Sequence, residues 1–192
     1  HRATGHSLGG TASDGRNAAI EAGKTAVTDN ADLILQSGLI DVVIDATGVP
    51  AVGAEIGLSA MEHGKHLVMM NVEDDVTNGA YLRREADRLG VVYSLGAGDE
   101  PSSCMELIEF VSAMGHKIVC AGKGKNNPLN IDALPDTYAE EAAQRNMNPR
   151  LLVEFVDGSK TMVEKVAIAN ATGQIHEVAG IQGRAATRDE LA

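Results

Sequence analysis

The sequence predicts an α/β fold in which part of a parallel sheet is followed by a smaller α/β (α+β) domain. Three short apolar runs begin at Asp41, His66 and Val91, spaced 25 residues apart. Unbroken runs of this kind are typical of strands that are buried on both faces of a parallel sheet. Apolar residues at helical spacing fill the gaps between the runs, as the crossovers of a parallel sheet require.

Start and stop signals bound the elements of the first half. Gly64 and Gly90 follow the two helical patterns and end them. A weaker unit precedes the first apolar run and ends at Gly38. The predicted elements are a loop over 1–15, a strand over 25–28, a helix over 30–37, strands beginning at 41, 66 and 91, and helices that include 52–60 and 82–89. In this repeated order, the carboxyl ends of the strands share one edge of the sheet.

The pattern changes after Leu95, where a glycine-rich loop begins. We therefore predict a domain boundary near Gly96, with domains over 1–96 and 97–192. The predicted elements of the second domain are a helix from about 104, a strand over 117–121, an exposed helix over 136–146, an antiparallel strand over 151–156 and a helix over 160–172. Alternating apolar residues predict the antiparallel strand, and Asp157 with Gly158 supplies a turn signal after it.

Composition and charge exclude several classes of function. The 192 residues carry a net charge of −11 and only 3% aromatic residues, without tryptophan. Both values disfavour nucleic-acid binding, which needs basic surfaces or aromatic stacking platforms. No apolar run approaches the roughly 20 residues of a membrane-spanning helix, so no membrane partner is expected. Cys104 and Cys120 lie within apolar patterns and are expected to be buried, reduced thiols of a cytoplasmic protein.

The loop after the first apolar run is the first candidate for ligand binding. It runs from Asp45 to Pro50, where a central strand ends and a helix begins. Gly48 would allow a ligand to approach the backbone, and the following helix offers N–H groups to an anion. The next strand ends at Asn71 to Glu73, at the same edge. Open α/β sheets bind ligands at this edge, and an ordinary strand-to-helix turn is the alternative interpretation.

A basic segment in the second domain is the second candidate. Residues 110–131 contain no Asp or Glu, although the chain is acidic. Lys123, Lys125 and Asn127 follow the strand that is predicted within this segment. A lysine at a strand end can polarise a carbonyl group or bind a phosphate or carboxylate, and a solvated basic loop is the alternative. Asp99 and Glu100 are candidate acid/base or metal-binding carboxylates, and the alternative is that Asp99 or Ser102 caps the next helix.

Two further patterns in the sequence bear on catalysis. The G-x-S-x-G sequence around Ser7 matches the nucleophile motif of serine hydrolases, but no apolar strand precedes it, so a loop is favoured. The histidines show no i, i+4 spacing on a helix, so no metal site is predicted.

A family resemblance rests on four segments: ATGVP, NVE, GAGDEPSS and AGKGKNNPLN. With these segments the chain resembles the deoxyxylulose-phosphate reductoisomerase-like oxidoreductases, which are related to homoserine dehydrogenase and often carry a C-terminal SAF-type domain. The resemblance covers about residues 15–173. It implies a Rossmann domain that binds NADP or NAD, followed by an α/β catalytic domain.

Two features depart from the pattern of that family. No G-x-G-x-x-G turn, which holds the pyrophosphate in such proteins, occurs before Asp41. The expectation is therefore a copy that is truncated at the N-terminus and lacks the first βαβ unit. Asn71, Val72 and Glu73 stand where homoserine dehydrogenases place a lysine, which disfavours homoserine as the substrate.

The predicted function is hydride transfer between NADP or NAD and a small anionic carbonyl or hydroxy compound. The predicted cofactor-binding residues are Ala46, Thr47, Gly48, Val49, Asn71, Glu73 and Gly98. The predicted catalytic residues are Lys123, Lys125, Asn127, Glu100 and Lys160, with Glu164 as a further contributor. The expected partner is a small-molecule substrate, and the expected assembly is a homo-oligomer. Two alternatives remain, a non-catalytic dinucleotide-fold module for binding or oligomerisation and a serine hydrolase that uses Ser7.

Overall fold

The computed structural model describes residues 6–7, 13–125, 127–176 and 187–191. The chain divides into two compact units, His1–Asp99 and Glu100–Ala192. The first unit contains two small parallel sheets with their helices, and the described part of the second unit is helical. The α/β fold class that the apolar runs predict is confirmed.

A parallel three-stranded sheet forms the centre of the first unit. Its strands, in the order β3-β4-β5, are β3 (Val42–Asp45), β4 (His66–Met69) and β5 (Tyr93–Leu95). Asp45 pairs with Met69, and Met69 pairs with Leu95, so the three strands end level with one another. The three apolar runs therefore form strands as predicted, and their carboxyl ends share one edge.

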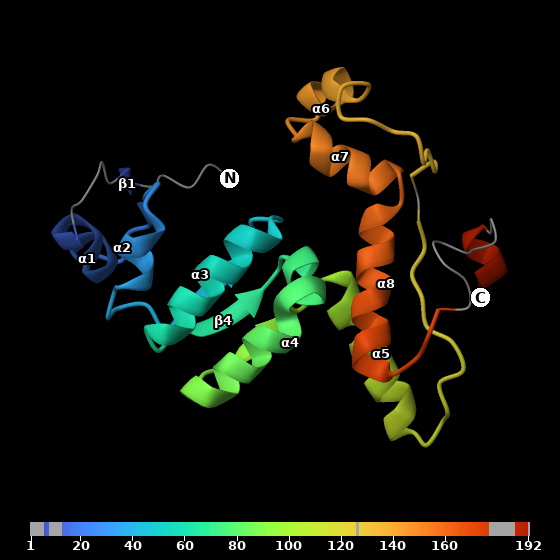
Figure 1. Ribbon diagram of the computed structural model, residues 1–192, viewed down its shortest axis with the longest axis horizontal. Helices are drawn as coiled ribbons and strands as arrows, with labels where there is room; N and C mark the ends of the chain where they lie inside the picture. Colours follow the sequence, from blue (N-terminus) through green and yellow to red (C-terminus); the bar gives the residue numbers. More distant parts are fainter. Residues whose placement is uncertain (1–5, 8–12, 126, 177–186, 192) are drawn as a thin grey trace. The chain divides into compact units, whose positions relative to one another are not determined.

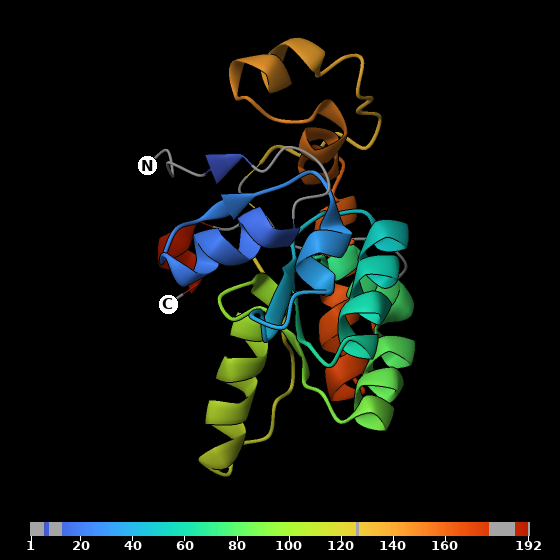
Figure 2. The same ribbon diagram turned by 90° about the vertical axis from the view of Figure 1, so that its left-hand side faces the viewer.

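Helices α3 (Pro50–Glu62) and α4 (Val72–Leu89) cover one face of this sheet, as Figures 1 and 2 show. The two helices pack against each other and against the strands. The buried core comprises Leu35, Val43, Ala60, Met61, Leu67, Met69, Leu82 and Ala86. Burying one large apolar side chain contributes about 1.5–3 kcal/mol, so this core fixes the strand ends relative to the helices that follow them.

The opposite face of strand β3 is exposed in the described part of the chain. Burial alternates along the strand, because Val43 and Asp45 are buried whereas Val42 and Ile44 are 46% and 64% exposed. The prediction that these strands are buried on both faces is therefore wrong for β3. An unbroken apolar run shows that a strand could be buried on both faces of its sheet. It does not show on which face other elements pack.

A second sheet joins β1 (His6–Ser7) in parallel to β2 (Ala26–Val27). Helix α1 (Ser13–Glu21) comes between them in the sequence, and helix α2 (Ala31–Leu35) follows β2. The strand predicted over 25–28 is confirmed, and the helix predicted over 30–37 is shorter than expected. The predicted loop over 1–15 is wrong where β1 and α1 form, because a pairing partner distant in sequence supplies the hydrogen bonds of β1. The rest of the G-x-S-x-G motif lies outside the described residues.

A buried lysine connects the end of α2 to the start of β4. Lys65 precedes β4 and is only 4% exposed. Its ammonium group donates hydrogen bonds to the main-chain oxygens of Ser37 and Ile40, the second at 2.8 Å. Main-chain carbonyl groups after a helix carry partial negative charge, which stabilises the ammonium group without a carboxylate.

Helices make up the described part of the second unit. They are α5 (Glu100–Ala113), α6 (Ala139–Gln144), α7 (Pro149–Val156), α8 (Ser159–Thr172) and the 3₁₀ helix η1 (Arg188–Leu191). Helix α8 packs against α5 and α7, and α7 packs against α6. The helix predicted over 160–172 is confirmed, and the helix predicted over 136–146 is shorter than expected. Across the described ranges, no helix is long and apolar enough to cross a membrane.

The antiparallel strand predicted over 151–156 is wrong, because these residues form most of helix α7. The side chain of Asn148 accepts a hydrogen bond from the N–H group of Arg150 at 2.9 Å, and Pro149 occupies the first helical turn. An Asn cap followed by Pro is a strong start signal for a helix. The buried residues of α7 are Leu152, Val153 and Val156. A short apolar run of this kind fits either a strand or a helix, and here the cap decides.

The strand predicted over 117–121 is also wrong. These residues pair with no other strand in the described part of the chain. A strand needs a neighbour for its backbone hydrogen bonds, and apolar alternation alone does not supply one. Cys120 in this segment is exposed, and Cys104 on α5 is half-buried, so the prediction of two buried thiols is wrong for Cys120.

Candidate functional site

The side chain of Asn71 joins the carboxyl ends of β3 and β4. Its Nδ2 group donates to Asp45 Oδ2 at 3.1 Å, to Thr47 Oγ1 at 3.2 Å and to the main-chain oxygen of Val49 at 3.1 Å. Its Oδ1 atom accepts a hydrogen bond from the N–H group of Asp74 at 3.2 Å and so caps helix α4. The structure therefore brings three of the predicted cofactor-binding residues, Thr47, Val49 and Asn71, into direct contact.

The loop between β3 and α3 is exposed and turns sharply. Asp45 Oδ1 accepts a hydrogen bond from the N–H group of Thr47 at 2.9 Å, and Gly48 adopts a φ of +66°, which favours glycine. Ala46, Thr47 and Val49 are exposed. Val49 begins helix α3 without a capping side chain. The loop therefore presents its main chain, together with the first N–H groups of α3, at the edge of the sheet.

The starts of α3 and α4 differ in charge. The first turn of α4 carries Glu73, Asp74 and Asp75, whereas the first turn of α3 carries no acidic residue and contains Pro50. The amino end of a helix attracts negative charge, and the carboxylates of α4 already occupy that position. Of these two helices, α3 is the one whose start suits an anionic group of a ligand.

Asp74 is fully buried at the same edge of the sheet. Its Oδ1 atom accepts a hydrogen bond from Asn78 Nδ2 at 2.6 Å, and its Oδ2 atom has no hydrogen-bond partner among the described residues. Burial raises the pKa of Asp74 above the ordinary value of 3.8, the hydrogen bond from Asn78 opposes this, and the charge of Asp45 adds to it. The folded protein therefore binds a proton at Asp74 more tightly than the unfolded chain does.

We expect Asp74→Asn to raise the free energy of unfolding at neutral pH by about 1 kcal/mol. A buried polar atom without a partner costs about 1–3 kcal/mol, and a neutral amide removes the repulsion between the charges of Asp74 and Asp45. Because the pKa of Asp74 is higher in the folded state, its favourable contribution is complete below about pH 4 and is lost as the pH rises through the folded value. The advantage of the variant should therefore disappear in acid.

Urea unfolding between acid and neutral pH measures this difference. Asp87→Asn is the control, because it removes an exposed carboxylate from the same helix. If wild type and Asp74→Asn show the same pH dependence, Asp74 is not a strained carboxyl group.

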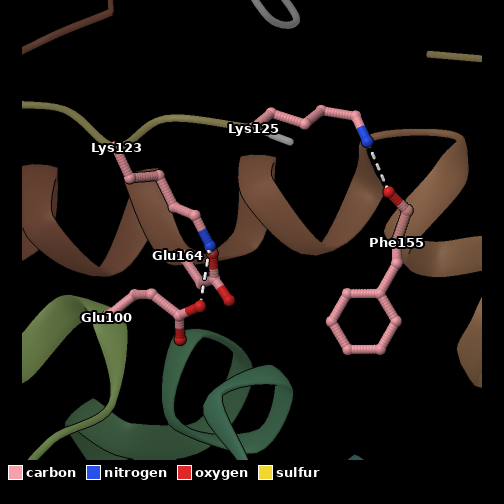
Figure 3. A network of polar contacts seen from close by, with 5 residues as sticks. All are labelled: Glu100, Lys123, Lys125, Phe155 and Glu164. Carbon is pink, nitrogen blue, oxygen red and sulfur yellow. Dashed lines mark hydrogen bonds and ion pairs between the residues drawn. The ribbon is translucent and has the colours of Figure 1, made fainter. Parts of the chain in front are cut away.

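An ion-pair cluster surrounds Lys123 in the second unit, as Figure 3 shows. The Nζ group of Lys123 donates to Glu164 Oε2, and it donates to Glu100 Oε1 at 3.0 Å. Lys123 lies in the loop after α5, Glu100 begins α5, and Glu164 lies in the middle of α8. Their side chains are 48% exposed for Glu100, 20% for Lys123 and 1% for Glu164. The cluster therefore has a solvent side at Glu100 and a buried side at Glu164.

The charges of the cluster keep Lys123 protonated. Burial lowers the pKa of Lys123, but the hydrogen bonds and charges of Glu164 and Glu100 outweigh burial, so the pKa is raised. Burial raises the pKa of Glu164, and the hydrogen bond and charge of Lys123 act against it. The Oε1 atom of Glu164 is buried and has no hydrogen-bond partner within the described ranges. The buried carboxylate of Glu164 therefore binds the ammonium group of Lys123, while the Lys123 side chain remains partly exposed to solvent.

The other predicted catalytic residues lie on neighbouring segments of the second unit. Lys125 points away from the cluster, and its Nζ group donates to the main-chain oxygen of Phe155 at 2.5 Å (Figure 3). Phe155 lies in the last turn of α7, so Lys125 stabilises the end of that helix. Lys160, in the first turn of α8, adds positive charge near Glu164. Asn127 is half-buried in the loop after α5.

Sequence reasoning missed the two carboxylates that surround Asn71. The spacing of Asn71 and Asp74 resembles a capping box, and this signal could have placed Asn71 at the start of α4. No local signal shows that Asp45 and Asp74 converge, because they belong to different elements that only the fold brings together. Gly98, another predicted cofactor-binding residue, lies in the exposed loop after β5 with a φ of +87°.

Two family descriptions match consecutive parts of the chain. Residues 10–95 match the family described as homoserine dehydrogenase, NAD binding domain. Residues 98–192 match the family described as oxidoreductase DRL, catalytic domain. A comparison with curated proteins finds no match.

Three solved structures resemble the chain at low identity. An NAD-binding oxidoreductase from Klebsiella pneumoniae is 16% identical, with a TM-score of 0.41. A second Klebsiella pneumoniae protein (20% identical, TM-score 0.37) and a Bacillus subtilis protein (17%, 0.40) are provisionally assigned as oxidoreductases. The alignments cover 52%, 53% and 77% of this chain, and 27%, 30% and 43% of those chains. The chain thus spans less than half the length of each, and at these TM-scores the likeness carries no argument about function.

The family matches agree with the two sets of residues described above. The NAD-binding match contains the parallel sheet and the loop after β3, and the catalytic match contains Lys123, Glu100 and Glu164. The two matched segments meet between residues 95 and 98, close to the division between the two compact units.

Proposed function

We propose that the protein transfers a hydride between NAD or NADP and a small anionic carbonyl or hydroxy compound. The observation that carries this proposal is Lys123, which two carboxylates hold in the segment that matches an oxidoreductase catalytic domain. A buried carboxylate on one side and a half-exposed one on the other keep the ammonium charged and within reach of a ligand.

The loop after β3 would hold the dinucleotide. Its donor set fits such a group, because exposed main chain at Ala46 to Val49 meets the start of α3, where no carboxylate competes for the N–H groups. Gly48 has a positive φ, which favours glycine, and without a side chain at this position a ligand can come close to the main chain of the loop. When bound, the dinucleotide supplies or accepts the hydride.

Lys123 would supply positive charge and a proton to the reacting oxygen. An ammonium group has three N–H donors, and two of those of Lys123 are directed at Glu164 and Glu100. The third can be donated to a carbonyl oxygen of the substrate. During reduction, negative charge develops on that oxygen, Lys123 stabilises it, and the proton moves from Nζ to the oxygen. Oxidation of the hydroxy compound returns the proton to Nζ.

The basic segment supports an anionic substrate. No carboxylate occurs between residues 110 and 131, and Lys117, Lys123 and Lys125 lie within this stretch. Because Lys125 is engaged by Phe155, Lys123 is the better candidate for the reacting oxygen. Lys117 adds positive charge in the same segment, which favours a phosphate or carboxylate over a neutral compound.

Backbone NMR spectroscopy tests the cofactor part of this proposal. Millimolar NADH or NADPH is expected to shift the amide signals of Ala46, Thr47, Gly48 and Val49, even if affinity is low. Inorganic pyrophosphate at equal ionic strength is the control for binding by charge alone. If neither dinucleotide moves these signals more than pyrophosphate does, the chain does not bind a nicotinamide cofactor at this loop.

A further inference from the structure

Asn71 makes contacts to two different elements with the two ends of one amide. Its Nδ2 group faces acceptors that belong to β3 and to the loop after it, namely Asp45 Oδ2, Thr47 Oγ1 and the main-chain oxygen of Val49. Its Oδ1 atom faces the N–H group of Asp74 in α4. A single side chain therefore fixes the loop after β3 to the start of α4.

The chemistry of these partners permits one orientation of the amide. A carboxylate and a carbonyl oxygen can only accept hydrogen bonds, and a backbone N–H group can only donate one. A flipped amide would place an oxygen against Asp45 and the main chain of Val49, and an NH₂ group against the N–H group of Asp74. The orientation of Asn71 is therefore set by complementary groups on both sides, and Asn71 itself is only 1% exposed.

The packing around Asn71 leaves no room for rearrangement. A Cβ atom on Gly53 of α3 would lie 2.5 Å from Asp45 Oδ2, 2.7 Å from Asn71 Nδ2 and 2.8 Å from Asp74 Oδ2. Three polar side chains, from the end of β3 and the start of α4, therefore converge on a helix position that only glycine can occupy. Such close packing fixes the backbone of α3 against Asn71 as well as the loop before it.

We infer that Asn71 is a positioning residue, which holds residues 46–49 in the conformation that receives the dinucleotide and does not itself have to touch it. This inference rests on the proposed cofactor role of that loop. Thr47 and Val49 are exposed while Asn71 beneath them is buried, so the ligand would meet the loop and not the amide that holds it. Loss of the Asn71 donors would leave α4 capped and would remove the hydrogen bonds from Asn71 to Thr47 and Val49 of the loop.

The variant Asn71→Ser separates these two roles. Serine is also a good N-cap, so its shorter side chain keeps an acceptor for the N–H group of Asp74 and lacks the NH₂ group that donates to Asp45, Thr47 and Val49. The matched control is Asn30→Ala, which removes the Asn cap of α2, a bond of 3.0 Å to the N–H group of Asp32, in the same unit. Thr47→Val is a milder second variant that removes one acceptor from the exposed loop and keeps Asn71.

Amide hydrogen exchange without ligand and titration with NADH and NADPH are the two measurements. We expect Asn71→Ser to speed exchange at Thr47 by about tenfold or more, since loss of a hydrogen bond to a charged group has effects of this size. Asn30→Ala should leave exchange at Thr47 unchanged. The dissociation constants of both dinucleotides should rise about tenfold in Asn71→Ser and less in Thr47→Val.

The outcomes separate this inference from the proposed function. If wild type binds neither dinucleotide, the proposed function fails, while the exchange data still report whether Asn71 holds the loop. If exchange at Thr47 is unchanged in Asn71→Ser, Asn71 does not position the loop. Should Asn71→Ser not fold, unchanged exchange and unchanged affinity in Thr47→Val would overturn the inference.

Discussion

A Lys123→Met variant is expected to lose at least about 10²-fold in kcat with small anionic carbonyl compounds, while its affinity for NADH and NADPH changes less than about twofold. Methionine keeps most of the length of the side chain and removes the ammonium group with its charge and its protons. Because Lys123 belongs to the second unit and the loop after β3 belongs to the first, loss of turnover without loss of cofactor affinity would separate chemistry from binding.

The single replacement leaves Glu164 buried without its cation, and breaking a buried ion pair costs about 3–5 kcal/mol. The double variant Lys123→Met with Glu164→Gln removes both charges and guards against loss of folding. Lys24→Met is the control, because Lys24 is exposed and lies outside the basic segment. Oxidation of NADH and NADPH in the full-length protein, followed by nicotinamide absorbance, gives the rates. Turnover near that of wild type in the folded variants would remove Lys123 from the mechanism.

The variant Gly53→Ala is expected to lower the free energy of unfolding of the first unit by about 3 kcal/mol. Within a helix, alanine is normally favoured over glycine by about 1 kcal/mol, so local propensity alone predicts the opposite sign. The added methyl group would lie within 2.8 Å of Asp45, Asn71 and Asp74, closer than real carbon contacts, so at least one of these buried groups must move. Each movement breaks a hydrogen bond in a buried site.

Chemical unfolding monitored by circular dichroism measures the effect of Gly53→Ala. Gly38→Ala is the control, because nothing lies within 4 Å of a Cβ atom at Gly38. We expect Gly38→Ala to change stability by less than about 0.5 kcal/mol. A gain in stability in Gly53→Ala would show that the carboxylates and Asn71 are not packed as closely as the structure has them.

The first unit could be predicted from the sequence because its signals are local. Each apolar run has strand length, Gly64 ends the helix that follows the first run, and Gly90 ends the helix that follows the second run. The side of the sheet that the helices cover could not be predicted, because burial of Val43 and exposure of Ile44 depend on packing across the unit. Sequence patterns therefore predict which residues form strands and helices, and tertiary contacts determine which face of each element is buried.

The second unit was harder to predict because its apolar runs are short. Residues 151–156 alternate like a strand, yet Asn148 and Pro149 start a helix there. At the candidate site, too, only part of the arrangement could be predicted from local sequence. A lysine within a segment free of acidic residues singles out Lys123 by charge, whereas its burial against Glu164 from α8 depends on the packing of two helices.

Lys65 gives the first unit a built-in chemical reporter. Reagents that acylate amines attack lysines at the surface, but Lys65 is only 4% exposed and its ammonium group donates to the main-chain oxygens of Ser37 and Ile40. Modification of Lys65 requires the segment after α2 to separate from the start of β4. The rate at which mass spectrometry finds this one lysine acylated therefore reports how often the unit opens under native conditions.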